Sequence, residues 1–127
     1  MSTLTGQQPS EVLHSEGELA SYFQRFAKPS TAIRVGIEAE FFGVDKKTGR
    51  ALPYDGPAGI EAVLKALAEG FGYDPVLEEG RVIALKRGDL WITLEPGGQV
   101  ELSAPPVFDV FEIEKQLQVF FRELAGL

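Results

Sequence analysis

The chain has 127 residues, a length that suits one domain, and 44% of its residues are hydrophobic, which is enough for a packed core. No apolar run approaches the length of a membrane span, and the formal net charge of −7, with scattered Lys and Arg, disfavours a nucleic-acid partner. Because the chain has no cysteine, disulfides and thiolate metal sites are excluded, and a cytoplasmic location without membrane binding is expected.

The first 14 residues form a polar segment that is predicted to be a flexible leader, followed by a single domain over residues 15–127. The leader holds the only histidine, His14, which is expected to be solvated, so a Ser–His–Asp catalytic site is close to excluded. Ser15 and Glu18 have the spacing of a helix capping box. Apolar residues follow at helical spacing and predict a helix over residues 16–27.

A strand is predicted next, over residues 34–44. Its alternation places Glu38 and Glu40 on one face and apolar residues on the other. A turn over residues 45–49 and a short extended piece over residues 51–54 follow.

The second predicted helix begins at Asp55-Gly56-Pro57, because proline is favoured in the first helical turn. Gly70 and Gly72 are predicted to end it. Its buried stripe is predicted to comprise Ile60, Val63, Leu64 and Leu67.

Short extended segments follow, and they are predicted over residues 73–78, 81–85, 90–95 and 99–103. Residues 86–89 are predicted to form a hairpin turn, in which Lys86 and Arg87 are read first as solvated and second as phosphate contacts. Pro96-Gly97-Gly98 is predicted to form another turn. Ala104-Pro105-Pro106 is predicted to end the sheet, since proline cannot donate to a ladder.

The last predicted helix covers residues 110–124, with Asp109 as its N-cap. Its apolar side needs cover, from the chain's own sheet or from another segment, and comprises Ile113, Leu117, Phe120, Phe121 and Leu124. Taken together, the elements predict an α+β fold, with an antiparallel or mixed sheet and helices flanking it.

One carboxylate pair lies on the first predicted strand. Residues i and i+2 of a strand point to the same side, so Glu38 and Glu40 project together. Two like charges at this spacing repel unless a cation or water screens them, and Mg²⁺ prefers such oxygen ligands. The alternative interpretation is a solvated strand face.

A second carboxylate pair is predicted in the hairpin around Pro96-Gly97-Gly98. A two-residue loop would mix polar and apolar residues on both faces, which a half-buried sheet disfavours. A loop longer by one residue is predicted to set Glu95 opposite Glu101 and Leu94 opposite Leu102, with each face consistent. The alternative is an exposed hairpin whose charges are accidental. The two pairs together indicate a divalent-cation site, and Mg²⁺ held by carboxylates commonly serves nucleotide phosphates because it keeps open positions for their oxygens. No P-loop motif is present, so ATP, if it binds, is expected to bind through this metal site on the sheet.

The same residues resemble a known family. The segment Val35-Gly36-Ile37-Glu38-Ala39-Glu40-Phe41 resembles the Gly-x-Glu-x-Glu strand of the glutamate–cysteine ligases, the plant and proteobacterial branch in particular. Tyr54-Asp55-Gly56 and residues 72–76 fit the same family. The most specific stretch is Ile92-Thr93-Leu94-Glu95-Pro96-Gly97-Gly98-Gln99-Val100-Glu101-Leu102-Ser103. The resemblance extends from about Glu18 to the last residue.

This resemblance implies a fold like that of glutamine synthetase and the guanidino kinases, and an ATP-dependent ligase of which this chain is the N-terminal portion. It implies that ATP phosphorylates the γ-carboxylate of glutamate and that the amine of cysteine then displaces phosphate, the first step of glutathione biosynthesis. It implies Mg²⁺ or Mn²⁺ held by Glu38, Glu40, Glu95 and Glu101. Gln99 is expected to orient one of these ligands or to contact a substrate or cofactor.

Members of this family are several times longer than this chain, so the chain is expected to hold only part of the site. The remainder of the enzyme, or a second copy of the chain, is the expected protein partner. Two alternatives stay open. One is a related carboxylate–amine ligase with another amine acceptor, which Phe42-Gly43-Val44-Asp45 slightly favours. The other is a non-catalytic module that binds metal, nucleotide or a partner.

Overall fold

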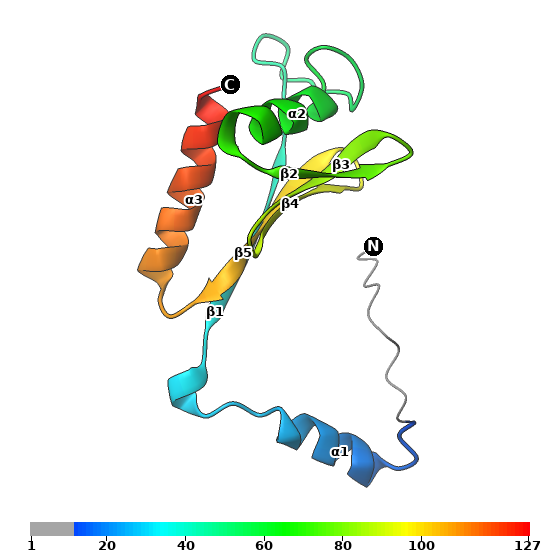
Figure 1. Cartoon of the computed structure of the whole chain (residues 1–127), viewed down its shortest axis with the longest axis vertical. Coiled ribbons are helices and arrows are strands. Elements are labelled where there is room, and N and C mark those ends of the chain that lie inside the picture. The colour runs from blue at the N-terminus through cyan, green and yellow to red at the C-terminus, as the bar shows by residue number, and fades with distance from the viewer. Residues whose placement is uncertain (1–11) are drawn as a thin grey trace. The chain divides into compact units, whose positions relative to one another are not determined.

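The computed structural model describes residues 12–127, and the chain divides into two compact units, residues 1–33 and 34–127 (Figure 1). Most of the predicted flexible leader, residues 1–11, lies outside the described residues. Residues 12–14 have no regular structure and are exposed. None of the described helices has both the length and the apolar character that crossing a membrane requires.

The first unit contains the helix α1 (Glu16–Arg25), which was predicted to share a single domain with the sheet. Ser15 caps it as predicted, because its hydroxyl accepts a hydrogen bond from the Glu18 amide at 3.2 Å. The Glu18 carboxylate accepts a hydrogen bond from the amide of His14 at 2.6 Å. In a capping box the usual donor is the amide of the N-cap residue, which here is Ser15. The helix ends two residues before the predicted limit, and a 3-10 turn, η1 (Ser30–Ala32), follows.

The second unit is built on a five-stranded sheet in the order β1-β5-β4-β3-β2. All of its described pairings are antiparallel, which confirms the α+β class and selects the antiparallel alternative over the mixed one. The likeness to glutamine synthetase stays a prediction. The strands are β1 (Val35–Phe42), β2 (Asp74–Glu78), β3 (Arg81–Arg87), β4 (Leu90–Glu95) and β5 (Gln99–Val107).

The sheet does not end at Ala104-Pro105-Pro106, so that prediction is wrong. β5 continues to Val107 and stays paired with β1, while β4 pairs with β5 only as far as Ser103. The register between β1 and β5 shifts between Val35 and Ile37, where β5 carries an extra residue. The prolines therefore lie where β4 has ended and where β5 itself is bulged against β1, and a missing amide hydrogen is tolerated there.

The helix α2 (Ile60–Phe71) begins three residues after Pro57, so the predicted start at residues 55–57 is wrong. The preceding chain turns back and caps α2 with its own carbonyl groups. The amide of Ile60 donates to the carbonyl of Pro53 at 2.9 Å, and the amide of Glu61 donates to the carbonyl of Tyr54 at 3.1 Å. Gly72 ends the helix in the left-handed conformation at φ 71°, as predicted.

The helix α3 (Val110–Ala125) confirms the last predicted helix and its cap. The carboxylate of Asp109 accepts from the amides of Phe111 at 2.9 Å and Glu112 at 3.0 Å. Phe120 is 1% exposed and packs on Phe41 of β1. The predicted burial of Phe121 is wrong, since 46% of its surface is exposed while one side contacts Phe41. The chain's own sheet therefore covers most of this apolar stripe.

Helices α2 and α3 lie on the same side of the sheet (Figure 1). The core between helices and sheet is formed by Ile60, Leu64, Leu67, Tyr73, Val82, Leu85, Ile92, Val100, Leu102 and Phe120. Because successive side chains of a strand alternate, the residues between these core positions point to the other side of the sheet. No described helix of this unit covers that side.

Candidate functional site

We define the open face as the surface of the sheet that points away from α2 and α3. The strand registers fix which side chains share it, because residues directly opposite in an antiparallel pair lie on the same side. Its polar and aromatic members include Glu38, Glu40, Phe42, Asp74, Lys86, Trp91, Thr93, Glu95, Gln99, Glu101 and Ser103. All four predicted metal ligands are on this face.

Two glutamates lie opposite each other near the β1 edge of the open face, and we call them the central pair because the other two predicted ligands flank them. Glu40 of β1 lies directly opposite Glu101 of β5, and Glu101 in turn lies opposite Thr93 of β4. Directly opposed residues have Cβ atoms about 5 Å apart, so the two carboxylates are close neighbours. This pair joins two segments that are remote in sequence, and the short motifs did not predict it.

The predicted opposition of Glu95 and Glu101 is wrong. Glu95 lies opposite Gln99, and the hairpin closes through the three residues between them. Gly97 and Gly98 have φ of 83° and 79°, and the amide of Gly98 donates to the carbonyl of Glu95 at 3.1 Å. The register therefore differs by two residues from the predicted one. A shift of two preserves the faces, so Glu95 and Glu101 still share the open face.

Two hydrogen bonds orient the central carboxylates. The side-chain amide of Gln99 donates to a carboxylate oxygen of Glu40 at 2.5 Å, and the hydroxyl of Ser103 donates to a carboxylate oxygen of Glu101 at 2.8 Å. Each donor lies on β5 beside the central pair. Gln99 is thus placed to hold a predicted ligand, while its direct contact with a substrate or cofactor stays a prediction.

The other two predicted ligands flank the central pair. Glu38 lies opposite Ser103, and Glu95 lies opposite Gln99, so each is a diagonal neighbour of Glu101. Among residues 12–127, no three acidic or histidine side chains gather closely enough to hold a metal ion together. The four glutamates therefore do not form a closed protein cage. Mg²⁺ is commonly bound by one or two carboxylates with water and phosphate oxygens, and the central pair suits that mode.

Two residues of the open face, Trp91 and Thr93, were not predicted from the sequence, whereas Lys86 was predicted in a turn and lies within β3. Trp91 and Lys86 are opposite each other on β4 and β3, and the ammonium of Lys86 lies 5.0 Å from the centre of the indole ring. The hydroxyl of Thr93 is buried and has no hydrogen-bond partner among the described residues. Counting back from Glu95 in steps of two would have placed Thr93 and Trp91 on its face.

Arg87 lies in a strand and is only partly exposed, so its prediction as a solvated turn residue is wrong. β3 extends through it, and its guanidinium donates to a carboxylate oxygen of Glu123 on α3 at 2.8 Å and to the carbonyl of Phe71 at 3.0 Å. These partners lie on the side of the helices. Arg87 is therefore a structural cation and not a phosphate contact, whereas Lys86 is exposed on the open face.

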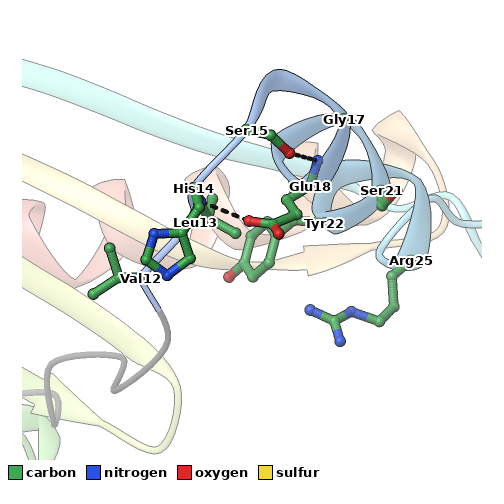
Figure 2. Close-up of a pocket in the computed structure, with 9 residues that line it drawn as sticks. All are labelled: Val12, Leu13, His14, Ser15, Gly17, Glu18, Ser21, Tyr22 and Arg25. Atoms are coloured by element: carbon green, nitrogen blue, oxygen red, sulfur yellow. Dashed lines mark hydrogen bonds between the residues drawn. The ribbon is translucent and has the colours of Figure 1, made fainter.

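A pocket in the first unit contains none of the predicted site residues. Figure 2 shows the side chains around it, with His14 and Glu18 at the start of α1 and Arg25 at its end. Its polar contacts are those that cap the helix. The open face is thus the better candidate for chemistry.

Comparison with known proteins points to one family. A family model described as glutamate-cysteine ligase family 2 matches residues 34–125. The chain is 43% identical over 100 residues to glutamate–cysteine ligase A, chloroplastic, of Oryza sativa subsp. japonica, a match that covers 79% of this chain and 20% of that protein. It is 39% identical over 90 residues to glutamate–cysteine ligase, chloroplastic, of Arabidopsis thaliana, which covers 71% of this chain and 17% of that protein.

These matches confirm the resemblance drawn from the strand and hairpin residues. The chain spans about a fifth of the length of the curated relatives it matches. The relatives' names describe chloroplastic proteins, and a cytoplasmic location of this chain stays a prediction.

Proposed function

Because the chain belongs to glutamate–cysteine ligase family 2, we propose that it forms the N-terminal, metal-binding part of an ATP-dependent ligase. That ligase joins the γ-carboxylate of glutamate to the amine of cysteine, the first step of glutathione biosynthesis. The observation that carries the proposal is the direct opposition of Glu40 and Glu101 on the open face.

This opposition has an energetic cost that a bound cation would remove. Like charges directly opposite in a sheet destabilise it by about 0.2–1 kcal/mol. The sheet holds each carboxylate with its own donor, that of Glu40 with Gln99 and that of Glu101 with Ser103. Oriented carboxylates beside an uncovered surface are what a Mg²⁺ ion with open positions for phosphate requires.

In the proposed site, Glu40 and Glu101 hold Mg²⁺ or Mn²⁺, with Glu38 and Glu95 as flanking ligands. The ion supplies electrostatic stabilisation of the ATP phosphates and of the negative charge that develops during phosphoryl transfer. Gln99 and Ser103 keep the central carboxylates oriented. The γ-carboxylate of glutamate accepts the phosphoryl group of ATP, and the amine of cysteine then displaces phosphate. Segments outside this chain complete the binding of the three substrates.

The proposal is tested by titrating Mn²⁺ into the 127-residue chain and following free Mn²⁺ by electron paramagnetic resonance, with and without a non-hydrolysable ATP analogue. We expect binding by the wild-type chain, tighter with the analogue, and about tenfold or more weaker in Glu40→Gln/Glu101→Gln. The matched control is Glu69→Gln/Glu114→Gln, which removes the same charge from exposed positions of α2 and α3 and is expected to bind like the wild type. Equal affinity of the two double variants would refute the proposed site.

A further inference from the structure

The sheet carries three basic side chains, and they differ in their partners. Arg81 forms ion pairs with Asp55 and Glu61, and Arg87 forms one with Glu123. Lys86 forms no ion pair within residues 12–127, although Asp74 lies directly opposite it on β2. It is thus the one cation of the three whose charge no described carboxylate neutralises.

Lys86 also occupies a defined place on the open face. Trp91 lies between Lys86 on β3 and Ser103 on β5, and Glu38 on β1 ends this row of opposed residues. The next row along the strands contains Glu40, Glu101 and Thr93. Neighbouring strands are about 5 Å apart and two residues of a strand span about 7 Å, so the backbone of Trp91 is about 8–9 Å from that of Glu101 and about 12 Å from that of Glu40.

The chemistry of this place suits an anionic ligand. The ammonium of Lys86 lies over the half-buried indole of Trp91, 5.0 Å from its centre, and so leans from β3 toward β4 and the carboxylates. An exposed ammonium without an ion-pair partner is available to an oxyanion, and the indole offers an apolar floor to the carbon atoms beside that oxyanion. The separation from Glu101 leaves room for a small ligand with one anionic end at Lys86 and the other at a cation bound by the glutamates.

We propose that Lys86 and Trp91 form an oxyanion subsite that binds one end of a substrate whose other end reaches the divalent cation proposed at Glu40 and Glu101. The ligand class is a small molecule bearing a carboxylate or a phosphate, which an amino acid or a nucleotide supplies. This inference rests on the proposed function, because it takes the open face as the substrate side of the sheet.

The chain has a single tryptophan, so its fluorescence reports on this subsite alone. The emission is followed while L-glutamate, or separately a non-hydrolysable ATP analogue, is added to the 127-residue chain in the presence of Mg²⁺. We expect a saturable change with at least one of the two ligands. In Lys86→Gln the dissociation constant should rise about tenfold, because a charge-assisted hydrogen bond is lost. Lys86→Arg should restore most of the affinity.

Lys115→Gln is the matched control, since this lysine is exposed on α3, and it should leave the dissociation constant unchanged. A response to glutamate identifies a carboxylate subsite, and a response to the analogue alone identifies a phosphate subsite. No saturable change with either ligand, or equal affinity of Lys86→Gln and wild type, would overturn the inference. Mn²⁺ binding that persists in Lys86→Gln would show that the proposed function survives such a failure.

Discussion

Glu123 lies on the inner side of α3 with 8% of its surface exposed, and side chains from outside α3 satisfy both of its carboxylate oxygens. The phenol of Tyr73 donates to one oxygen at 2.6 Å and Arg87 donates to the other at 2.8 Å. The guanidinium of Arg87 also stacks 4.1 Å from the ring centre of Tyr73 and donates to the carbonyl of Phe71. This cluster fixes α3 to the end of α2 and to β3.

Removing this carboxylate should therefore destabilise the fold. Glu123→Ala leaves Arg87, whose side chain is 34% exposed, without its anion and leaves the Tyr73 hydroxyl unpaired. We expect the free energy of unfolding in urea to fall by about 2–3 kcal/mol. Glu114→Ala on the exposed side of α3 should change it by less than about 0.5 kcal/mol. Similar losses in the two variants would contradict a structural role for the cluster.

Because of Tyr73, the stability of the fold is expected to decrease at alkaline pH. Burial, together with the neighbouring Glu123 carboxylate, raises the pKa of the Tyr73 phenol far above its ordinary value of about 10. The folded state thus keeps a proton that the unfolded state loses above about pH 10, so the free energy of unfolding must fall as the pH rises beyond that value.

Absorbance and urea titrations between pH 9 and the alkaline limit of folding test this dependence. Of the three tyrosines in the chain, we expect one to remain protonated until the protein unfolds. Tyr73→Phe should show a weaker loss of stability over the same pH range. Ionisation of all three tyrosines in the folded protein near pH 10 would rule out this account.

At the scale of the elements, the start of α2 depends on a close approach of backbone. Gly59 is the N-cap of α2, and a Cβ atom there would lie 2.4 Å from the carbonyl oxygen of Asp55. Gly70 lies inside the same helix and has open space around it. Substitution by alanine should therefore have opposite effects on the free energy of unfolding at Gly59 and at Gly70.

We expect Gly59→Ala to lower the free energy of unfolding by about 1–3 kcal/mol, because the backbone must move to relieve the overlap. Gly70→Ala should raise it by about 0.5–1 kcal/mol, since alanine is the better helix former. Thermal and urea unfolding of both variants provide the measurement. A tolerated Gly59→Ala would mean that the loop before α2 is more adaptable than its contacts indicate.

Elements whose signals are local could be predicted from the sequence. The caps Ser15 and Asp109 and the stop at Gly72 act within a few residues, and the structure confirms all three. The limits of β4, residues 90–95, were also predicted correctly. In each case the determining contacts lie within the segment itself.

Features that depend on distant partners could not be predicted in this way. β5 continues through Pro105 and Pro106 because β4 has already ended beside it and the pairing with β1 is bulged. The opposition of Glu40 and Glu101 arises from the position of β1 at the edge of the sheet, next to β5. The alternation of each strand predicted which residues share the open face, but neither the order of strands nor the hairpin register follows from alternation alone.

At the scale of the whole molecule, the chain spans about a fifth of the length of its ligase relatives, and the described helices of the second unit leave one face of its sheet uncovered. Catalysis of a two-step ligation requires substrates held in position, and two oriented carboxylates do not do this alone. We therefore expect the isolated chain to form no γ-glutamylcysteine from glutamate, cysteine and ATP, as assayed by chromatography. Metal-dependent product formation would show that the chain is sufficient for activity.

The most direct test of the metal site is urea unfolding of the wild-type chain and of Glu101→Gln, each with and without Mg²⁺. Without the ion, we expect the variant to be as stable as the wild type or more stable by up to about 1 kcal/mol, because the repulsion with Glu40 is removed. With the ion, the wild type should gain stability in proportion to its binding and the variant should gain little. An equal effect of Mg²⁺ on both proteins, or none on the wild type, would contradict the assignment of the opposed glutamates as the metal site.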